Sequence, residues 1–410
     1  MTQVLFIGAV WPEPDSTAAG VRICQLVKGF IHEGYEVRFV SSAAKTPHSA
    51  PLEEWGVSTD FIVLNDASFD NQLQEWQPDI IVFDRFMTEE QYGWRVSEQC
   101  PNAVKILDSE DLHFLRKGRE RAYKSGVGYQ LHQENDELCY REIASILRCD
   151  LTLVISYAEY KLLTQNFPIP ETILTYLPIH TEVISEETQN QLPGFQERNG
   201  FVTLGNWWHE PNRQSVLYLH RIWPQIKATL PKAELFVYGA NLAENAQSLH
   251  QPKQGFHIMG RAESVEEIYT RHRVLLAPLF FGAGIKGKIL DGMQFGLPNV
   301  TTAIGAEGMQ WNQTWNGLLA NQDDFVEKAI QLYQDQTLWE QSVHTGFEIN
   351  NQLFADRTPE RNFYYQLKNI LAHVSEHRGQ NFLGQMLQHH TLQSHRYMSK
   401  WIELKNKSQT

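Results

Sequence analysis

Two lysines, Lys286 and Lys288, stand where a glycine-rich loop turns into a helix. The stretch Leu275–Pro298 (LLAPLFFGAGIKGKILDGMQFGLP) begins as an apolar strand, turns through Phe281–Gly284, and continues with apolar residues every four positions, which predicts a helix. A helix N-terminus presents free N–H groups to an anion. Cations are normally disfavoured there, so two lysines indicate that a bound anion offsets them. The alternative is that both lysines are solvated at the start of a surface helix.

The same loop fits part of a nucleotide-binding pattern. Gly282, Gly287 and Lys288 match G-x-x-x-x-G-K, the phosphate loop of NTPases. That pattern needs Ser or Thr next, because the hydroxyl binds Mg²⁺, and here the residue is Ile289. An NTPase therefore stays only an alternative.

The longer run PLFFGAGIKGKILDGMQFGLPNVTTAIGAEGM resembles the donor-binding segment of glycosyltransferase family 4 (group 1), retaining enzymes of the GT-B fold, in the variant with a GaGiK-type donor loop. The resemblance implies transfer of a sugar from a nucleotide-sugar to an acceptor hydroxyl in glycan or polysaccharide biosynthesis. It implies that Gly282, Gly284, Lys286 and Lys288 bind the donor diphosphate. Lys286 would be catalytic, since it would offset charge on the leaving group.

The family's signature is a pair of acidic residues eight positions apart. Asp291 occupies the second place, whose carboxylate contacts the ribose hydroxyls in the family. The first place, which contacts the transferred sugar, is Ala283 and has no side chain to donate or accept a hydrogen bond. A pseudoenzyme that binds a nucleotide-sugar or a partner protein therefore remains an alternative, as does a nucleotide-sugar epimerase.

Further donor contacts are implied at three places. In many members an Arg and a Lys bind the diphosphate, and the matching segment here reads GNWWHEPNRQSVLYL. At the places of these two basic residues this chain has Asn206 and Asn212, with Arg213 one place beyond. Gly260 and Arg261 match the region that reads the nucleobase. Gly20, at the start of the first helix, would let a diphosphate or an acceptor approach the backbone; close helix–strand packing is the alternative.

Polar residues after the strands of the first half form the expected acceptor side, because ligands of open parallel sheets bind beyond the carboxyl ends of strands. Asp108 and His113 are expected to orient the acceptor and act in catalysis. The other acceptor candidates are Asp84, Arg85 and Asp111. The alternatives are a helix N-cap for Asp111 or Ser109, a surface histidine for His113, and a local salt bridge for Asp84–Arg85.

Just downstream, LRKGRERAYK (Leu115–Lys124) concentrates five basic residues with one Glu. It could contact anionic lipid or a phosphorylated acceptor, although such runs are commonly solvated helix faces.

Composition narrows the class of protein. The chain has 410 residues and a formal charge of −13, which argues against a nucleic-acid partner. Its four cysteines, Cys24, Cys100, Cys139 and Cys149, have no metal or disulfide spacing. The sequence shows no signal peptide and no membrane span, so a cytoplasmic location is expected, with peripheral contact at the inner membrane face inferred from the family. The spacing of His389, His390 and His395 predicts no metal site, and no cofactor is expected besides the nucleotide-sugar substrate.

Alternating strands and helices predict an α/β protein with two Rossmann-like, doubly wound domains of the GT-B class, facing a central cleft, and a helical C-terminal segment. Strands are expected at Val4–Ile7, Glu36–Val40, Phe61–Leu64, Ile80–Phe83, Val104–Leu107, Leu151–Ile155, Phe201–Leu204, Glu234–Tyr238, Phe256–Met259 and Val274–Leu279. Helices are expected at Ala18–His32, Leu112–Leu147 with a break near Gly126–Gly128, Asn212–Ile226, Val265–Arg271 and Phe382–Asn406.

The expected domains are 1–180 for the acceptor and 200–375 for the nucleotide-sugar donor, joined by a polar linker at 181–199. Residues 376–410 are expected to form a terminal helix that crosses back to the first domain, as family members have it. The sequence leaves the oligomeric state open.

Overall fold

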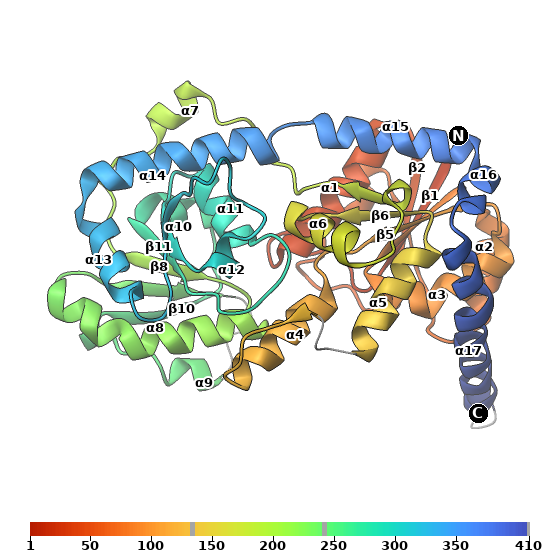
Figure 1. Ribbon diagram of the computed structural model, residues 1–410, viewed down its shortest axis with the longest axis horizontal. Helices are drawn as coiled ribbons and strands as arrows, with labels where there is room; N and C mark the ends of the chain where they lie inside the picture. The colour runs from red at the N-terminus through yellow and green to blue at the C-terminus, as the bar shows by residue number, and fades with distance from the viewer. Residues whose placement is uncertain (132–135, 240–243, 408–410) are drawn as a thin grey trace. The chain divides into compact units, whose positions relative to one another are not determined.

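The computed structural model describes residues 1–131, 136–239 and 244–407 (Figure 1). The chain forms two compact units, and each unit collects separate parts of the sequence. The first unit comprises Met1–Phe114, Leu131–Ile179 and Thr358–Thr410. The second comprises Leu115–Gln130 and His180–Arg357.

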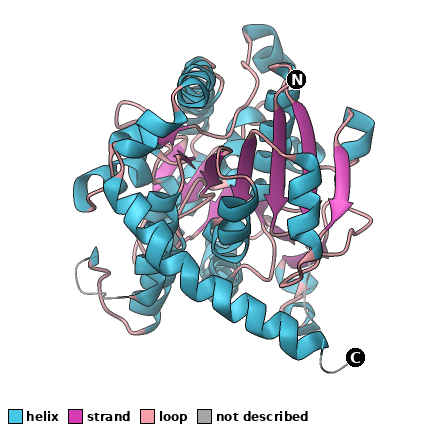
Figure 2. Ribbon diagram, turned by 90° about the vertical axis from the view of Figure 1, so that its right-hand side faces the viewer, coloured by secondary structure: helices cyan, strands magenta, loops and turns pink. Residues whose placement is uncertain are grey.

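The first unit is built on a seven-stranded sheet, within the described residues, in the order β3-β2-β1-β4-β5-β6-β7 (Figure 2). All neighbouring strands run parallel, and the order reverses between β1 and β4. The strands are β1 (Gln3–Gly8), β2 (Glu36–Ser41), β3 (Ser58–Phe61), β4 (Ile80–Asp84), β5 (Val104–Asp108), β6 (Leu151–Val154) and β7 (Leu174–Tyr176).

Apolar runs explain the central strands. Every residue of β4 (IIVFD) and of β5 (VKILD) is buried, as expected for strands of a parallel sheet covered on both faces. The sequence also explains the first helix. Thr17 caps it by accepting from the N–H of Gly20, and its buried side carries Ile23, Val27 and Phe30.

Helices cover both faces of this sheet (Figure 2). They are α1 (Ala18–His32), α2 (Ser68–Trp76), α3 (Phe86–Gln99), α4 (His113–Lys124), α5 (Glu137–Arg148), α6 (Tyr157–Asn166), α15 (Thr358–Ala372), α16 (Val374–Gly379) and α17 (Phe382–Lys407). Short 3₁₀ turns lie at Leu52–Trp55 and Glu171–Ile173. Only the first two residues of α4 belong to this unit; its remainder belongs to the second.

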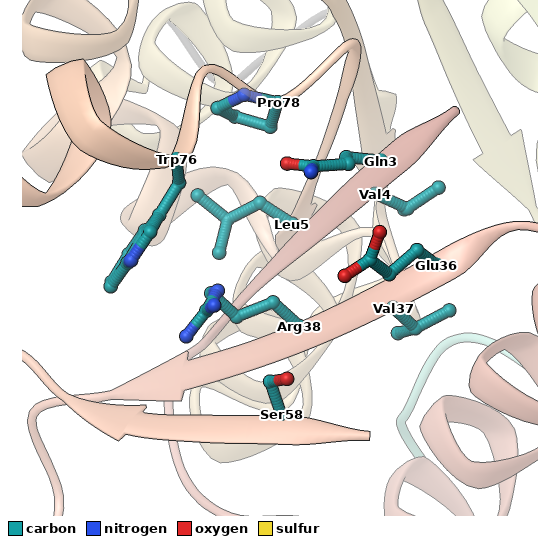
Figure 3. Close-up of a pocket in the computed structure, with 9 residues that line it drawn as sticks. All are labelled: Gln3, Val4, Leu5, Glu36, Val37, Arg38, Ser58, Trp76 and Pro78. Atoms are coloured by element: carbon teal, nitrogen blue, oxygen red, sulfur yellow. The ribbon is translucent and has the colours of Figure 1, made fainter. Parts of the chain in front are cut away.

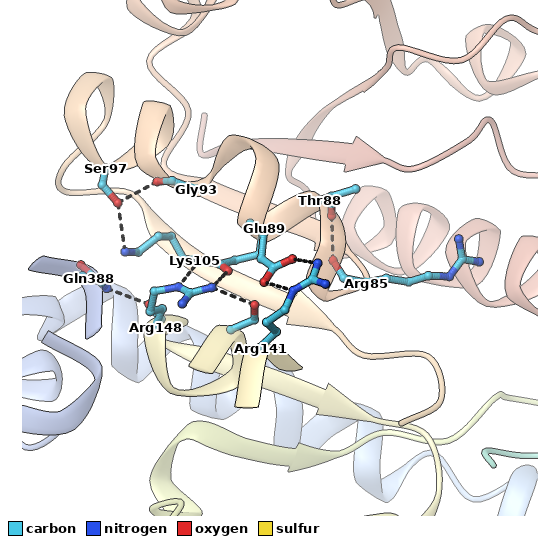
Figure 4. Close-up of polar contacts among 11 residues, drawn as sticks. Arg85, Thr88, Glu89, Gly93, Ser97, Lys105, Arg141, Arg148 and Gln388 are labelled. Carbon is cyan, nitrogen blue, oxygen red and sulfur yellow. Dashed lines mark hydrogen bonds and ion pairs between the residues drawn. The ribbon is translucent and has the colours of Figure 1, made fainter. Parts of the chain in front are cut away.

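Two ion pairs connect helix α3 to helix α5 (Figure 4). The Arg148 guanidinium, 1% exposed, donates from Nε to Glu89 Oε1 at 2.9 Å. Arg141 pairs with Glu90 in the same way, with Nε 3.0 Å from Oε1. Removing one partner of the buried Arg148–Glu89 pair would leave an uncompensated charge, whereas Arg141 is 46% exposed and its pair with Glu90 contributes less.

The second unit has a six-stranded parallel sheet, again within the described residues, in the order β10-β9-β8-β11-β12-β13. The order reverses between β8 and β11. Its strands are β8 (Phe201–Leu204), β9 (Leu235–Tyr238), β10 (Phe256–Gly260), β11 (Val274–Ala277), β12 (Asn299–Thr301) and β13 (Gly317–Leu319).

Its helices are α7 (Glu186–Gln191), α8 (Glu210–Thr229), α9 (Glu244–Gln247), α10 (Val265–Arg271), α11 (Gly287–Gln294), α12 (Ala303–Ala306), α13 (Phe325–Gln334) and α14 (Gln336–Ile349). A 3₁₀ turn lies at Pro252–Gln254, and a π-helical turn, Asn350–Phe354, follows α14. The core includes Trp223, Leu235 and Phe325. Two parallel, doubly wound units confirm the predicted fold class.

The bounds of the strand predicted at Phe61–Leu64 are wrong. Strand β3 is Ser58–Phe61, so the two ranges share only Phe61, and the residues after it are not part of the strand. Val63 and Leu64 are 48% and 43% exposed, so the apolar run that suggested a strand is a surface run. Strand β13 was not predicted, because its three residues, GLL, are too few to show a period.

The units also differ from the predicted domains. Residues 358–375 pack with the first unit, where Gln366 donates to the Thr172 carbonyl at 3.0 Å and Phe363 packs edge-on against Phe30. Within the expected linker, α7 forms, and Asn350 donates to the Glu182 carbonyl at 3.0 Å. None of the described helices is long and apolar enough to cross a membrane.

Candidate functional site

The glycine loop of the second unit lies at the point where its strand order reverses. The loop follows β11, and the segment that begins at Gly205 follows the neighbouring strand β8. Ligands of doubly wound sheets bind beyond the carboxyl ends of strands at this position. The topology therefore brings the two sequence segments predicted to bind the donor to one edge of one sheet.

Two glycines shape the loop. Gly282 has φ +149° and Gly284 has φ +65°, conformations that other L-residues adopt only with strain. A Cβ at Gly282 would meet only Lys286 Cε, at 3.9 Å, so this glycine is required by backbone conformation and leaves space beside it. A bare backbone at this point is suited to the close approach of a ligand.

The N-terminus of α11 is open. Among the described residues, no side chain caps it, and its N-cap residue is Lys286. The Lys286 side chain is 8% exposed and folds back, so that Nζ donates to the Gly284 carbonyl at 2.7 Å. The lysine thereby holds the loop and keeps its charge beside the free N–H groups, an arrangement suited to an anion.

Lys288 connects helix α11 to the segment that follows strand β8. Its Nζ donates to Asn212 Oδ1 at 2.7 Å, and Asn212 Nδ2 donates to the Asn206 carbonyl at 3.1 Å. Burial lowers the Lys288 pKa from 10.5 to about 7. Its ammonium is thus held by a neutral amide, and an anion bound here would stabilise the charged form.

Asp291 stands one turn further along α11. Burial raises its pKa from 3.8 to about 7. Its carboxylate has no hydrogen-bond donor within the described part of the chain. A desolvated carboxylate without a donor costs stability, and ligand hydroxyls would offset that cost.

Sequence reasoning missed a clamp on the glycine loop. Arg119, from the part of α4 that belongs to the second unit, donates to the Gly282 carbonyl at 2.9 Å and pairs with both carboxylate oxygens of Glu307 at 2.7 and 2.8 Å. Tyr123 stacks on Phe280, with 5.6 Å between ring centroids. Interaction with Arg119 lowers the pKa of Glu307 despite its burial, and Lys286 contributes further.

The basic run at 115–124 is therefore occupied internally. Besides Arg119, both Lys117 and Lys124 pair with Glu120, at 2.9 and 2.7 Å. The helix carries its own counter-charges, which weakens the interpretation of this run as a lipid or phosphate contact. In the sequence, the arginines and lysines spaced around one Glu were the signal that could have indicated these internal ion pairs.

Other expected donor residues lie apart from this arrangement. The Arg213 side chain is 47% exposed and forms a bidentate ion pair with Glu210, at 2.8 Å to each carboxylate oxygen. Arg261 is exposed, and Gly260 ends β10 with φ +84° while its carbonyl accepts from the Gly239 N–H at 2.7 Å. The structure brings together Gly282, Gly284, Lys286 and Lys288; it does not bring Arg213 to them.

In the first unit, acidic side chains gather where β1, β4 and β5 end. Asp84 Oδ2 accepts from the Ala9 N–H at 3.1 Å, across the point where the strand order reverses, and lies 3.6 Å from Arg85 Nη1. The local salt bridge considered for Asp84–Arg85 is therefore present. Asp84 Oδ1 is buried without a partner among the described residues.

Asp108 is fully buried and paired. Its Oδ1 accepts from Nε and Nη2 of Arg22, both at 3.3 Å, while Oδ2 has no partner in the described chain. Burial raises the pKa of Asp108 even though Arg22 opposes the shift. Holding Arg22 is the contact that the structure shows for this carboxylate, and it differs from the expected solvent-facing acceptor contact.

Glu110 is the residue that sequence reasoning passed over. It is 7% exposed, its Oε1 has no partner among the described residues, and its backbone has φ +59°. Burial raises the pKa of Glu110 well above its usual value, and Asp108 adds to the shift. A strained backbone and a buried carboxyl with a raised pKa are features of functional sites. A third acidic residue in ILDSEDLH was the signal.

His113 is held rather than solvated. Its ring packs edge-on against Phe86, and Nδ1 lies 3.1 Å from the Asp111 carbonyl and 3.5 Å from Glu142 Oε1. Glu142 accepts from the N–H groups of His113 and Phe114, at 3.0 and 2.8 Å, and so caps α4 from another helix. Ser109, considered as that cap, donates instead to the Leu153 carbonyl at 2.9 Å.

Packing accounts for Gly20. A Cβ there would lie 2.3 Å from the Glu13 carbonyl oxygen, so the loop after β1 presses on the helix backbone. The close-packing alternative thus describes this glycine, and no space for a ligand is left at that point.

One pocket lies away from these residues (Figure 3). It is at the opposite, amino-terminal end of β1, β2 and β3. Its lining consists of Gln3, Val4, Leu5, Glu36, Val37, Arg38, Ser58, Trp76 and Pro78.

Comparison with known proteins finds a family match within the second unit. Residues 198–335 match the model of the family described as glycosyl transferases group 1. A Klebsiella pneumoniae protein, described as an uncharacterized 44.6 kDa protein in the cps region, is 29% identical over 137 residues. That match covers 31% of this chain and 35% of the relative, so the chain aligns with about a third of the length of this curated protein.

Among solved structures, sucrose-phosphate synthase from Thermosynechococcus elongatus is similar with a TM-score of 0.64 and 14% identity, over 91% of this chain and 100% of that one. Anabaena HepE, solved with UDP and glucose, also has a TM-score of 0.64, at 12% identity over 90% of this chain and 100% of that one. The chain therefore has the GT-B fold found in glycosyltransferases, and its residues 198–335 match a group 1 glycosyl transferase domain.

Proposed function

We propose that this protein is a retaining glycosyltransferase that moves a sugar, such as a hexose, from a nucleotide-sugar to an acceptor hydroxyl in glycan biosynthesis. The observation that carries the proposal is the open N-terminus of α11, where Lys286 and the glycine loop face Lys288 and Asn212 at the strand-order reversal. This arrangement offers N–H groups and two ammonium groups to one diphosphate.

In the reaction, the bond from the sugar's anomeric carbon to the diphosphate breaks and a bond to the acceptor oxygen forms. The departing nucleoside diphosphate keeps the bonding electron pair and gains one negative charge, and the proton of the acceptor hydroxyl passes to solvent. Lys286, Lys288 and the α11 N–H groups would stabilise that charge, which is commonly the largest contribution to such catalysis. Asp291 would accept hydrogen bonds from the ribose hydroxyls. Gly260 and Arg261 would lie near the nucleobase.

On the acceptor side, the carboxylate cluster of the first unit supplies the candidate groups. Glu110, whose pKa burial raises, is the candidate to exchange a proton with a bound hydroxyl, and Asp108 and Asp84 lie close enough to act on it electrostatically. His113 and Asp111 flank the cluster in sequence and contact each other. The acceptor would be a glycan, a lipid-linked sugar or another hydroxyl compound.

The first experiment is thermal unfolding with UDP, GDP, ADP, CDP and dTDP and their sugars. A ligand at 100 times its dissociation constant stabilises the folded state by about 2.7 kcal/mol, which gives a clear shift. UDP is the first candidate, because HepE was solved with UDP and glucose. A shift with one base, followed by acceptor-dependent release of that nucleoside diphosphate, is the expected result.

A second candidate is a GT-B protein that binds without transfer. Ala283 favours it, because no side chain stands where the family contacts the transferred sugar. Binding of a nucleotide-sugar with no turnover in any acceptor screen would select this candidate. Acceptor-independent conversion of the donor would indicate an epimerase, and Mg²⁺-dependent phosphate release would indicate an NTPase.

A further inference from the structure

Helix α17 packs on the first unit through one face only. It runs along the outside of that unit to the end marked C in Figure 2. Its contacts with α3 and α5 recur along this face. They are Gln388 Nε2 to the Arg148 carbonyl at 2.7 Å, Arg396 Nε to Glu98 at 2.8 Å, and Arg95 Nη2 to Ser399 Oγ at 3.4 Å.

The opposite face of α17 is apolar and exposed. Leu383, Met386, Tyr397, Trp401 and Leu404 are 40%, 41%, 65%, 62% and 68% exposed, and their spacing of three and four residues within each group places them on one side of the helix. Met398, 57% exposed, lies beside them. We call these six residues the α17 outer face. His390 and Gln393 separate its two parts, so the larger part is in the last turns.

The outer face combines an aromatic pair with cations. Lys400, Lys405 and Lys407 are exposed in the same turns, and Lys405 Nζ lies 5.4 Å from the centroid of the Trp401 ring. Lys400 Nζ lies 5.9 Å from the centroid of the Trp94 ring on α3, and Lys407 pairs with Glu403 at 2.6 Å. The helix carries four Lys and Arg residues against one Glu, whereas the whole chain has a formal charge of −13. Arg396 pairs with Glu98 and Lys407 with Glu403, so Lys400 and Lys405 supply the positive charge of the outer face. A local excess of positive charge on an acidic protein indicates an anionic partner.

The chemistry of this face fits a lipid surface. Tyr and Trp have amphipathic rings that sit at the level of lipid headgroups, and Lys side chains extend to anionic headgroups from a helix lying in the interface. A soluble protein seldom keeps Trp, Tyr, Leu and Met exposed together on one stripe. The apolar stripe and the positive charge thus point to the same partner.

We propose that the α17 outer face docks this protein on an anionic membrane surface, with the helix lying along the interface. Apolar side chains would enter the headgroup boundary, and Lys400 and Lys405 would contact the anionic headgroups. The proposal rests on α17 alone and stands whether or not the proposed glycosyl transfer is correct.

Vesicle sedimentation of the full chain tests it. Wild-type protein is expected to bind vesicles of phosphatidylcholine with phosphatidylglycerol, and to bind vesicles of phosphatidylcholine alone much less. The combined variant Tyr397→Ser, Trp401→Ser, Leu404→Ser is expected to reduce the partition coefficient by about tenfold or more. Lys400→Gln with Lys405→Gln should remove the preference for phosphatidylglycerol while some binding remains.

A matched control removes apolar surface elsewhere. Phe61 and Tyr365 are 58% and 79% exposed, and Phe61→Ser with Tyr365→Ser should leave vesicle binding unchanged. All these positions are on the surface, so circular dichroism should show folded protein in every variant. Vesicle binding that the triple variant retains in full would overturn the proposal.

A second copy of this chain is the rival occupant of the face. Light scattering that gives a dimer for the wild type and a monomer for the triple variant, together with no sedimentation with either vesicle, would also overturn the proposal. A monomer that sediments only with the anionic vesicles would support it.

Discussion

Lys288 Nζ lies 2.7 Å from Asn212 Oδ1, and this contact joins the helix after β11 to the helix after β8. A neutral amide orients the ammonium without neutralising it, so the lysine keeps its charge for a ligand. A carboxylate at position 212 would instead compete with an anion. The resemblance to family 4 leads one to expect a basic pair on the β8 side, and the structure shows Asn212 positioning a lysine from the β11 side.

Replacing Lys288 by Met should weaken binding of the nucleoside diphosphate. A hydrogen bond to a charged group contributes about 1.5–3 kcal/mol, so the dissociation constant should rise about 10- to 100-fold. Calorimetric titration with UDP, or with whichever base gives the thermal shift, measures the change. Lys253→Met, at an exposed position, is the matched control and should bind like the wild type. Equal affinities for both variants would remove Lys288 from the site.

Binding should also weaken as the pH rises. The Lys288 pKa is lowered to about 7, so in the free protein its ammonium loses its proton above that pH. From about pH 7 to about pH 9, affinity should fall by up to tenfold per unit, until the pKa of the bound state is reached. The decline should be much smaller in Lys288→Met. A wild-type affinity that is flat over this range would contradict the assignment.

Asp291→Asn should stabilise the free protein and weaken donor binding. Burial raises the Asp291 pKa from 3.8 to about 7, so the folded state binds more protons than the unfolded state between these values. The resulting penalty is absent below about pH 4 and complete above about pH 7. At about pH 8, unfolding in urea should therefore show Asp291→Asn more stable by about 1 kcal/mol or more. At low pH the two proteins should be alike.

Much of the fold follows from sequence pattern. The predicted bounds of α1 and α10 agree with the structure, because each helix has a polar cap and an apolar period that point to the same answer. Four of the six second-unit strands, β8 to β11, were located by short buried runs between turn residues, whereas β12 and β13, with three residues each, were not. The predicted bounds were wrong at β3, because Val63 and Leu64 are apolar but exposed.

The candidate site was harder to predict, because its contacts join distant residues. The loop at Gly282–Lys288 was evident from local spacing alone. Its partners Asn212 and Arg119 could not be ranked without knowing which strands are neighbours, and Glu110 differs from Asp108 only through burial and backbone conformation. Sequence gives the residue types after each strand; it does not give their solvation.

Two carboxylates of the first unit should respond differently to amidation. Asp108→Asn would leave Arg22, which is 1% exposed, without its counter-charge, and removing one partner of a buried pair costs about 3–5 kcal/mol. Glu110→Gln should change stability little, because Glu110 Oε1 has no hydrogen-bond partner among the described residues and burial already raises the pKa of this carboxyl well above its usual value. Urea unfolding compares the two variants at neutral pH.

Activity should separate them further. Once a donor and an acceptor are known, Glu110→Gln should retain donor affinity and lose about tenfold or more in acceptor-dependent turnover, since an amide cannot exchange a proton as a carboxylic acid does. Full turnover in Glu110→Gln would show that the buried carboxyl has only a structural effect.

Arg119 and Glu307 should act as one unit in the stability of the glycine loop. Their two-pronged pair is partly buried, and Arg119 also holds the Gly282 carbonyl, so each single variant, Arg119→Met or Glu307→Gln, should destabilise the protein. The double variant should be less destabilised than the sum, with a coupling energy of about 1 kcal/mol or more in a double-mutant cycle measured by urea unfolding. The surface pair Lys328–Asp324 provides the control cycle, with an expected coupling of about 0.5 kcal/mol or less. Because Arg119 anchors the loop that carries Lys286, Arg119→Met should also raise the dissociation constant of the donor nucleotide, whereas the control variants should not. Additive single effects with unchanged nucleotide affinity would mean that the clamp is only a surface contact.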